Sequence, residues 1–340
     1  MQSTLASAFG AGQMSIHASL RRTLPTWLHP PRRFWIIPVA AIFLLLHAVG
    51  ESGGGGTEWR SAAPLPLART EVAATVAGGE IVVAAGFLAD GSSSKQVDAY
   101  SPARDRWRRL PDLPVAVNHA MAVTFRGRPY VIGGYAGPRR PLRAAYRLEG
   151  GRWQALPRPP AGRAAAGAAV AEGKLYVVGG IGPGGLARTA LVFDFATSRW
   201  STMTGPTPRE HLATASIGGR VYALAGRLAG IDTNLALLEV YTPGQRGWRK
   251  LRPIPHPRGG TGVTVLGSDL VSVGGEEPSG TIASVYAYGT RSGDWRRLTD
   301  LGTPRHGLGV VTAAGRVYAI GGGPEPGLFV SEANEFLPLP

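Results

Sequence analysis

The chain repeats itself: six copies of one pattern, about 47 residues apart, run from residue 57 to the end of its 340 residues. Tryptophan marks the period, with intervals of 48, 46, 47, 48 and 47 residues between Trp59, Trp107, Trp153, Trp200, Trp248 and Trp295. An aromatic residue stands seven positions before each of the last five, at Tyr100, Tyr146, Phe193, Tyr241 and Tyr288. A pair of small residues closes an apolar run once per period, at Ala85-Gly86, Gly133-Gly134, Gly179-Gly180, Ala225-Gly226, Gly274-Gly275 and Gly321-Gly322. Three markers in one register identify a repeat architecture, in which each unit packs against its neighbours.

Each unit has the local pattern of four short β-strands. Runs such as residues 174–178 are β-branched and aromatic, and glycines stop them. A tight turn such as Glu172-Gly173 joins each run to the small or apolar stretch before it, because glycine supplies the positive φ of a two-residue hairpin. A third run carries the aromatic residue and a fourth carries the tryptophan. Four strands per period, without helical periodicity after Ser52, predict one blade of a β-propeller.

The order of residues within a unit resembles the Kelch repeat. The third unit shows it in full, with Arg163, Gly173, Tyr176, Gly179-Gly180, Phe193-Asp194 and Trp200. The resemblance covers about five-sixths of the chain, and it departs from the Kelch pattern where Ala85 and Ala225 replace the first glycine of the pair. The resemblance implies an all-β fold, a six-bladed Kelch-type β-propeller with four antiparallel strands per blade.

The two ends of the repeat region complement each other. The sixth unit runs through Gly321-Gly322 to Phe336 and stops before any tryptophan strand, whereas the missing strand stands at the other end, at Trp59. Unpaired edge strands are a liability. We therefore expect the N-terminal Trp59 strand to close the last blade, as a terminal strand commonly does in Kelch propellers.

Residues 1–50 belong to a different class of sequence. They contain no acidic residue, carry Arg21, Arg22, Arg32 and Arg33, and run apolar over residues 34–50. This basic tail and its apolar segment indicate a signal peptide or an uncleaved signal anchor. Both alternatives export the propeller, which we expect to be periplasmic, extracellular or membrane-anchored outside the cytoplasm. Residues 51–56 are then a Gly-rich linker, and residues 57–340 form the propeller domain.

The absence of cysteine removes several chemistries. The chain has no disulfide, no thiolate metal site and no cysteine nucleophile. It is also excluded as a copper radical enzyme of the galactose-oxidase type, because those Kelch relatives need a cysteine cross-linked to tyrosine. No His-x-His or His-x-x-x-His pair occurs in the sequence, so neither a metal site nor a cofactor is expected.

The charge of the chain bears on its partners. The formal net charge is +14, and without the four arginines of residues 1–50 it is +10, from 32 basic and 22 acidic residues. Only three of the 36 basic residues are lysine, a composition typical of a GC-rich bacterial genome. Nucleic acid is not expected as a partner, because no basic helix or stacking platform accompanies the charge. We expect a monomer that binds an acidic protein, an acidic peptide or an anionic carbohydrate, with the membrane contacted only through the N-terminal segment.

An arginine recurs sixteen residues before the small-residue pair in five of six units. Repeat symmetry places these arginines and the polar residues that follow them around one axis, where guanidinium groups recognise carboxylate, sulfate or phosphate. In Kelch domains that bind acidic peptides, the equivalent arginines reach into the pocket. The predicted ligand-binding residues are Arg69, Asn118, His119, Arg163, Arg209, Arg258, Arg305 and His306. The alternative is that each arginine is tied to the backbone or a carboxylate of a neighbouring blade.

A catalytic role has only weak candidates in the sequence. Arg209, Glu210 and His211 are the one place where an arginine, a carboxylate and an imidazole occur together, and either Glu210 or His211 could act as general acid or base. Adjacent strand residues point to opposite faces, so both can face the channel only if a bulge interrupts the strand. No residue is therefore assigned as catalytic.

Two functions remain. The first is an exported Kelch propeller that acts as a binding module for an anionic ligand or acidic partner at the channel mouth. The second is a periplasmic sugar isomerase, similar to bacterial six-bladed Kelch mutarotases that act on sialic acid. A propeller whose mouth binds nothing specific is a third possibility, and the fold alone does not decide among them.

Overall fold

The computed structural model describes residues 58–137 and 140–338. The chain divides into two units, Met1–Gly53 and Gly54–Pro340, and all described residues belong to the second. The predicted export segment, residues 34–50, lies outside the described residues. The described part of the chain contains no helix with the length and apolar character needed to cross a membrane.

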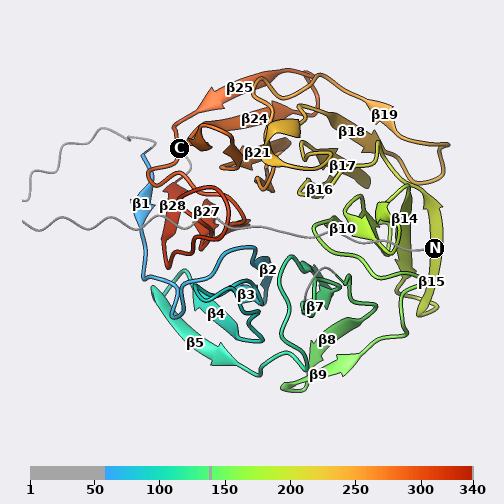
Figure 1. Ribbon diagram of the computed structural model, residues 1–340, viewed down its shortest axis with the longest axis horizontal. Helices are drawn as coiled ribbons and strands as arrows, with labels where there is room; N and C mark the ends of the chain where they lie inside the picture. Colours follow the sequence, from blue (N-terminus) through green and yellow to red (C-terminus); the bar gives the residue numbers. More distant parts are fainter. Residues whose placement is uncertain (1–57, 138–139, 339–340) are drawn as a thin grey trace, which may run out of the picture. The chain divides into compact units, whose positions relative to one another are not determined.

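The second unit is the expected six-bladed β-propeller, with four antiparallel strands in each blade (Figure 1). Blade one contains β2 (Ala73–Ala77), β3 (Glu80–Ala84), β4 (Val97–Ser101) and β5 (Arg106–Leu110). Blade two contains β6 (Met121–Phe125), β7 (Arg128–Ile132), β8 (Ala145–Glu149) and β9 (Arg152–Ala155). Blade three contains β10 (Gly167–Ala171), β11 (Lys174–Val178), β14 (Thr189–Asp194) and β15 (Arg199–Thr204). In each blade the first strand is innermost and the last is outermost.

Blades four to six follow the same order. Blade four contains β16 (Ala213–Ile217), β17 (Arg220–Leu224), β18 (Leu238–Tyr241) and β19 (Arg249–Lys250). Blade five contains β20 (Gly262–Leu266), β21 (Asp269–Val273), β24 (Val285–Gly289) and β25 (Trp295–Leu298). Blade six contains β26 (Gly309–Ala313), β27 (Arg316–Ile320), β28 (Asn334–Pro338) and β1 (Arg60–Ser61). Two short hairpins, β12 (Ile181–Gly182) with β13 (Gly185–Leu186) and β22 (Glu276–Glu277) with β23 (Gly280–Thr281), and one 3-10 turn, η1 (Ile231–Thr233), lie in loops.

The ring closes as the sequence predicts. Strand β1 pairs antiparallel with β28, where Arg60 lies opposite Phe336. The innermost strands of the sixth and first blades, β26 and β2, are neighbours like those of every other consecutive pair of blades. The strand that follows Trp59 is therefore the outermost strand of the sixth blade.

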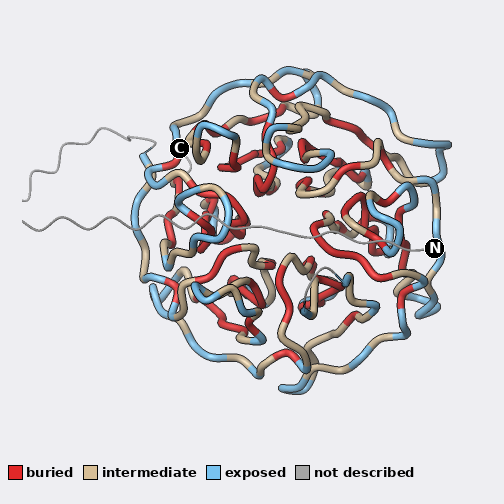
Figure 2. Tube along the Cα trace, viewed as in Figure 1, coloured by how far each residue is buried: buried red, intermediate tan, exposed pale blue. Residues whose placement is uncertain are grey.

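The tryptophans that define the repeat join consecutive blades. The indole N–H of Trp107 donates to the carbonyl of Ala63 at 2.8 Å, and that of Trp200 donates to the carbonyl of Pro157 at 2.7 Å. The same bond recurs in blades two, four and five, about 43 residues back along the chain, from Trp153, Trp248 and Trp295. Buried apolar side chains fill the space between neighbouring blades, whereas the outermost strands are exposed (Figure 2).

Antiparallel order sets which loops share a face of the ring. The connections from first to second strand and from third to fourth strand lie at one end of each blade. The connections from second to third strand, and from each blade to the next, lie at the other end, which we call the loop face. Because the innermost strands begin at the loop face, the predicted arginines and the polar residues after them all lie there.

Candidate functional site

The recurring arginines are buried inside the blades. Arg69, Arg209, Arg258 and Arg305 are all 0% exposed, and Arg163 is 3% exposed. The sixteen-residue spacing found in the sequence corresponds to a hydrogen bond between the arginine and the first residue of the small-residue pair. Arg209 Nε donates to the carbonyl of Ala225 at 2.6 Å, and Arg305 Nε donates to that of Gly321 at 2.8 Å. Arg69 and Arg258 donate through Nη1 to the equivalent carbonyls.

Acidic or hydroxyl partners complete the coordination of these guanidinium groups. Arg69 forms an ion pair with Asp98 at 2.6 Å, Arg209 pairs with Glu239, and Arg305 pairs with Glu335. Arg258 donates to the hydroxyl of Ser284 at 2.7 Å instead. Arg163 has no carboxylate partner within the described residues, and burial lowers its pKa to about 10. The arrangement favours the structural alternative, although each partner belongs to the arginine's own blade rather than to a neighbouring one.

A ring of backbone hydrogen bonds surrounds the axis two residues beyond each arginine position. The N–H of His119 donates to the carbonyl of Glu71 at 3.2 Å, that of Ala165 to His119 at 3.1 Å and that of His211 to Ala165 at 2.8 Å. The series continues through Gly260 and Gly307 and returns to blade one at Val72. All six residues, Glu71, His119, Ala165, His211, Gly260 and Gly307, have positive φ between 49° and 65°.

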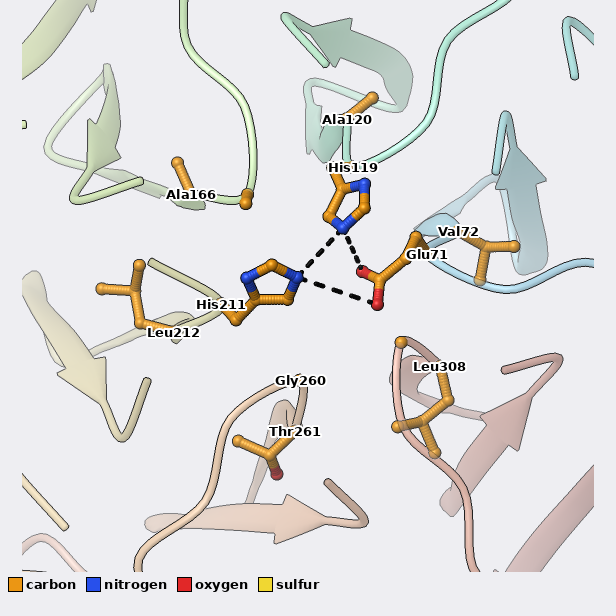
Figure 3. A pocket seen from close by; sticks show the side chains of 12 residues that line it. Glu71, Val72, His119, Ala120, Ala166, His211, Leu212, Gly260, Thr261 and Leu308 are labelled. Carbon is orange, nitrogen blue, oxygen red and sulfur yellow. Dashed lines mark hydrogen bonds and ion pairs between the residues drawn. The ribbon is translucent and has the colours of Figure 1, made fainter. Parts of the chain in front are cut away.

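Positive φ costs a residue with a side chain of the order of 1–3 kcal/mol, and such strain gathers at functional sites. Glycine occupies the ring in two blades, yet three others place Glu71, His119 and His211 there. The side chains of these three residues point toward one another across the axis (Figure 3). We call them the axial triad.

The axial triad is compact. Nε2 of His119 lies 3.0 Å from Nε2 of His211 and 3.4 Å from Oε2 of Glu71. Oε1 of Glu71 lies 3.9 Å from Nε2 of His211. One ligand atom from each residue falls within 4.8 Å of the others, so the triad could hold a metal ion. Among the described residues, the axial triad is the group of His and acidic side chains whose ligand atoms lie this close together.

A second layer of polar side chains holds the triad. Oδ1 of Asn118 lies 2.6 Å from Nδ1 of His119, and Oε1 of Glu210 lies 3.2 Å from Nδ1 of His211. His306 approaches Oε1 of Glu71 through Nδ1 at 3.4 Å, and its buried Nε2 has no hydrogen-bond partner within the described residues. The predicted residues Asn118, His119 and His306 are thus brought together at the axis.

Arg227 and Glu276 extend this layer. Arg227 contacts Glu210 at 3.1 Å and Glu276 at 2.6 Å. Glu276 in turn lies 3.7 Å from His306. Both residues directly follow a small-residue pair, at the start of the second-to-third-strand loop, and that common position was the available signal.

The side chains of Glu210 and His211 contact each other although the two residues are adjacent. The positive φ of His211, 51°, breaks the strand alternation that would otherwise point them to opposite faces. Glu210 nevertheless reaches only the outer side of the His211 ring and Arg227. It therefore supports His211 rather than sharing the centre of the triad.

Burial and charge act against each other in this cluster. Burial lowers the pKa of His119 to about 4, outweighing the neighbouring carboxylate of Glu71, so this imidazole is neutral at pH 7. Burial raises the pKa of Glu71, but His119, His306 and His211 together bring it well below its ordinary value. Burial lowers the pKa of His306, but its bond to Glu71 and the charges of Glu71 and Glu276 raise it overall.

Two cavities lie on the loop face, and the first of them borders the triad. One, of about 630 Å³, is lined by Phe87, Tyr135, Asn118, His119 and His211 among others and is mostly apolar. The other, of about 440 Å³, lies between blades two and three and is lined by Arg140, Arg143 and Arg158. The loop between β7 and β8 contributes to both, with Gly137 in the first and Arg140 in the second. We call them the apolar cavity and the basic cavity.

The fold and the repeated blade contacts define a six-bladed β-propeller built from one sequence motif. Comparison with known proteins identifies the motif. The Kelch motif model matches residues 68–114 and 162–207, in blades one and three. The chain therefore carries Kelch motifs, as its resemblance predicted.

Several Kelch proteins are similar to this chain. Kelch-like protein terF of Aspergillus terreus is 28% identical over 243 residues, which are 64% of this chain and 52% of that protein. Kelch-like protein 34 of Homo sapiens is 29% identical over 218 residues, 64% of this chain and 27% of that protein. Kelch-like protein 40 of Mus musculus is 35% identical over 79 residues, 23% and 13% respectively. The chain thus spans about half of the first relative and less of the others.

Proposed function

We propose that this chain is a protein-interaction module whose loop face binds an acidic segment of a partner protein. Kelch propellers typically bind proteins, and the names of the relatives give no enzymatic activity. The observation that carries the acidic specificity is the basic cavity. Its three arginines are exposed, and none of the described residues that line it is acidic.

The basic cavity differs from the buried arginines in what its guanidinium groups can reach. Arg209 and Arg305 donate their N–H groups to carbonyls and carboxylates within the fold. Arg143 donates through Nε to the carbonyl of Pro159, which leaves its terminal nitrogens for another acceptor. Guanidinium groups bind carboxylates through two parallel hydrogen bonds. We therefore move the predicted anion-binding role from the arginine ring to Arg140, Arg143 and Arg158.

Apolar contacts on the same face would complement this charge. Leu228, Leu328 and Phe329 are the large apolar side chains most exposed in the described residues, at 44–47%. They lie in second-to-third-strand loops of blades four and six, whose neighbouring residues Arg227 and Gly327 both contact Glu276 of blade five. Buried apolar anchors with a polar rim are typical of protein interfaces.

Fluorescence polarisation with a labelled poly-glutamate peptide tests the proposal on the full chain. Reversal of the three charges in Arg140→Glu/Arg143→Glu/Arg158→Glu should lower affinity at least about tenfold, since three exposed pairs of up to ~1 kcal/mol each are lost. Binding should also weaken as salt rises, because exposed charges are screened.

A matched control separates this cavity from the net charge of the protein. Arg106→Glu/Arg152→Glu/Arg199→Glu makes the same change of charge at the first residues of β5, β9 and β15, which are exposed at the opposite end of the blades. This variant should bind the peptide nearly as well as the unaltered chain. Equal losses of peptide affinity in the two triple variants would show that only the net charge of the protein matters and would overturn the proposal.

The sugar-isomerase alternative stays a prediction. Its proposed arginines are buried, and Glu210 is held by Arg227 and His211, so no observation favours it over protein binding. A mutarotation assay with sialic acid tests it directly. Export likewise stays a proposal that rests on residues 34–50 of the sequence, and fractionation of cells producing the full chain tests it.

A further inference from the structure

The two imidazoles of the axial triad face each other through their Nε2 atoms, which lie 3.0 Å apart. Oδ1 of Asn118 is an acceptor 2.6 Å from Nδ1 of His119, which favours the tautomer with its N–H on Nδ1 and a lone pair on Nε2. Oε1 of Glu210 lies 3.2 Å from Nδ1 of His211, a contact without hydrogen-bond geometry. With the N–H of His211 on Nδ1 as well, two lone pairs meet at 3.0 Å.

Such a contact is repulsive unless a cation lies between the nitrogens. The carboxylate of Glu71 adds negative charge to the same point, at 3.4 Å from one Nε2 and 3.9 Å from the other. Ligand atoms bound to a tetrahedral Zn²⁺ at 2.0–2.1 Å stand roughly 3.3 Å apart. The separations of 3.0, 3.4 and 3.9 Å in the triad bracket that value.

We propose that Glu71, His119 and His211 bind one divalent transition-metal ion of the zinc type at the propeller axis. Two imidazoles and one carboxylate suit zinc, cobalt or iron(II) better than calcium or magnesium, which prefer all-oxygen sites. The ligands come from blades one, two and four, and the ring of backbone hydrogen bonds fixes their Cα positions.

The surroundings of the triad have the features that support a metal centre. Metal-bound histidines usually donate their second N–H to a carboxylate or amide oxygen, and ligating carboxylates are themselves hydrogen-bonded. Asn118 holds Nδ1 of His119 in this way, and Glu210 and His306 lie 3.2 Å from His211 and 3.4 Å from Glu71. Gly307 leaves room for the carboxylate, because a Cβ there would lie 2.6 Å from Oε1 of Glu71.

Three protein ligands leave a coordination position open. Sites with three ligands keep a place for water or a further ligand, whereas closed structural sites have four. All three ligands line one cavity of about 110 Å³ at the axis, and His119 and His211 also line the apolar cavity of about 630 Å³, so a further ligand has room beside the triad. A small anion or a donor group of a ligand that fills the cavity could complete the coordination.

Cobalt(II) titration of the full chain, stripped of metal with a chelator, tests the proposal. We expect about one ion per chain and visible absorption bands typical of four- or five-coordinate cobalt, with Zn²⁺ displacing the cobalt. Azide should shift the bands, because it enters the open position. His119→Ala and His211→Ala should each lose the bands, and Asn118→Ala should weaken binding about tenfold, as outer-layer changes do.

His256→Ala is the matched control. His256 is partly exposed and pairs with Glu277 at 2.8 Å outside the triad, so its removal should leave cobalt binding unchanged. Thermal unfolding without metal shows which variants fold, and Zn²⁺ should raise the melting temperature of the unaltered chain but not that of folded His119→Ala/His211→Ala. If the unaltered chain takes up no more cobalt or zinc than this double variant, the imidazoles share a proton instead and the metal site is refuted.

Discussion

The indole Nε1–H of Trp59 donates to the carbonyl of Thr299 at 3.1 Å, across 240 residues of sequence. It is the same bond that each other repeat tryptophan makes to the preceding blade, here formed between the two ends of the propeller. Trp59 also packs against the apolar cluster that contains Leu301 and Leu337. One residue thus continues the repeat and closes the ring.

Replacement of Trp59 should therefore destabilise the whole propeller. Trp59→Phe removes the hydrogen bond and should cost about 1 kcal/mol of unfolding free energy. Trp59→Ala also removes the packing and should cost about 3 kcal/mol. Urea unfolding followed by far-UV circular dichroism measures both, with Trp200→Phe as the control at an equivalent bond that does not close the ring. Unchanged midpoints for both Trp59 variants would mean that the closing strand contributes nothing to stability.

Arg209 and Glu239 should behave as a buried structural pair. Both side chains are almost fully buried, and Glu239 also accepts hydrogen bonds from Thr207. Removal of one partner leaves an uncompensated charge, so Arg209→Met alone should cost about 3 kcal/mol or more. Arg209→Met/Glu239→Met should recover much of that loss. A stable Arg209→Met that no longer binds the poly-glutamate peptide would instead restore the arginine to the ligand-binding role predicted from sequence.

Much of the fold was predictable because the repeat markers are local contacts. The seven-residue spacing of aromatic residue and tryptophan is a cross-strand pair in blades one, three and five, where Tyr100 lies opposite Trp107. Blade two differs, since Trp153 lies opposite Leu148. The cause is the two-residue turn Gly150-Gly151, with φ of 60° and 74°, because a shorter turn changes which residues lie opposite each other in the two strands. Spacing alone did not show that change of register.

The site was predictable only in part. The arginine spacing was found, but the sequence did not show that the carbonyl sixteen residues later accepts a hydrogen bond from the guanidinium group and holds it inside the blade. The axial triad has no short-range motif, because Glu71, His119 and His211 come from three blades and converge only through the ring. Their shared place, two residues after the arginine position, put them among the polar residues expected around the axis, but nothing local showed that these three meet.

Ala314 should be a position where glycine stabilises the protein. It lies in the exposed turn between β26 and β27 with φ of 46°, followed by Gly315 with φ of 69°. The left-handed conformation costs alanine roughly 1–2 kcal/mol, which exceeds the entropy that glycine loses on folding. Ala314→Gly should therefore raise the free energy of unfolding by about 0.5–1 kcal/mol in urea. Ala103→Gly, at an exposed alanine without positive φ, should lower it; a gain at both sites would point to another cause.

Asp105 should make ring closure sensitive to acid. Its Oδ1 accepts hydrogen bonds from the hydroxyl of Tyr100 at 2.6 Å and from the N–H of Ala63 in the closing segment at 2.7 Å. The bond from Tyr100, and then that from Ala63, hold the pKa of Asp105 below its usual value. A carboxyl whose pKa is lower in the folded state stabilises the fold above the unfolded pKa, about 3.9, and loses that contribution as pH falls further.

Asp105→Asn isolates this effect, because asparagine tolerates the positive φ of 48° at this position but carries no charge. The variant should unfold at lower urea than the unaltered chain at pH 7, and the gap between them should narrow at pH 3. Asp232→Asn, at an exposed carboxylate of η1, controls for the loss of one negative charge. A gap that is equally wide at pH 3 and pH 7 would show that the two hydrogen bonds do not depend on the ionised carboxylate. Since Ala63 lies two residues after the end of β1, a narrowing gap would instead show that the ionised Asp105 holds the strand that closes the propeller.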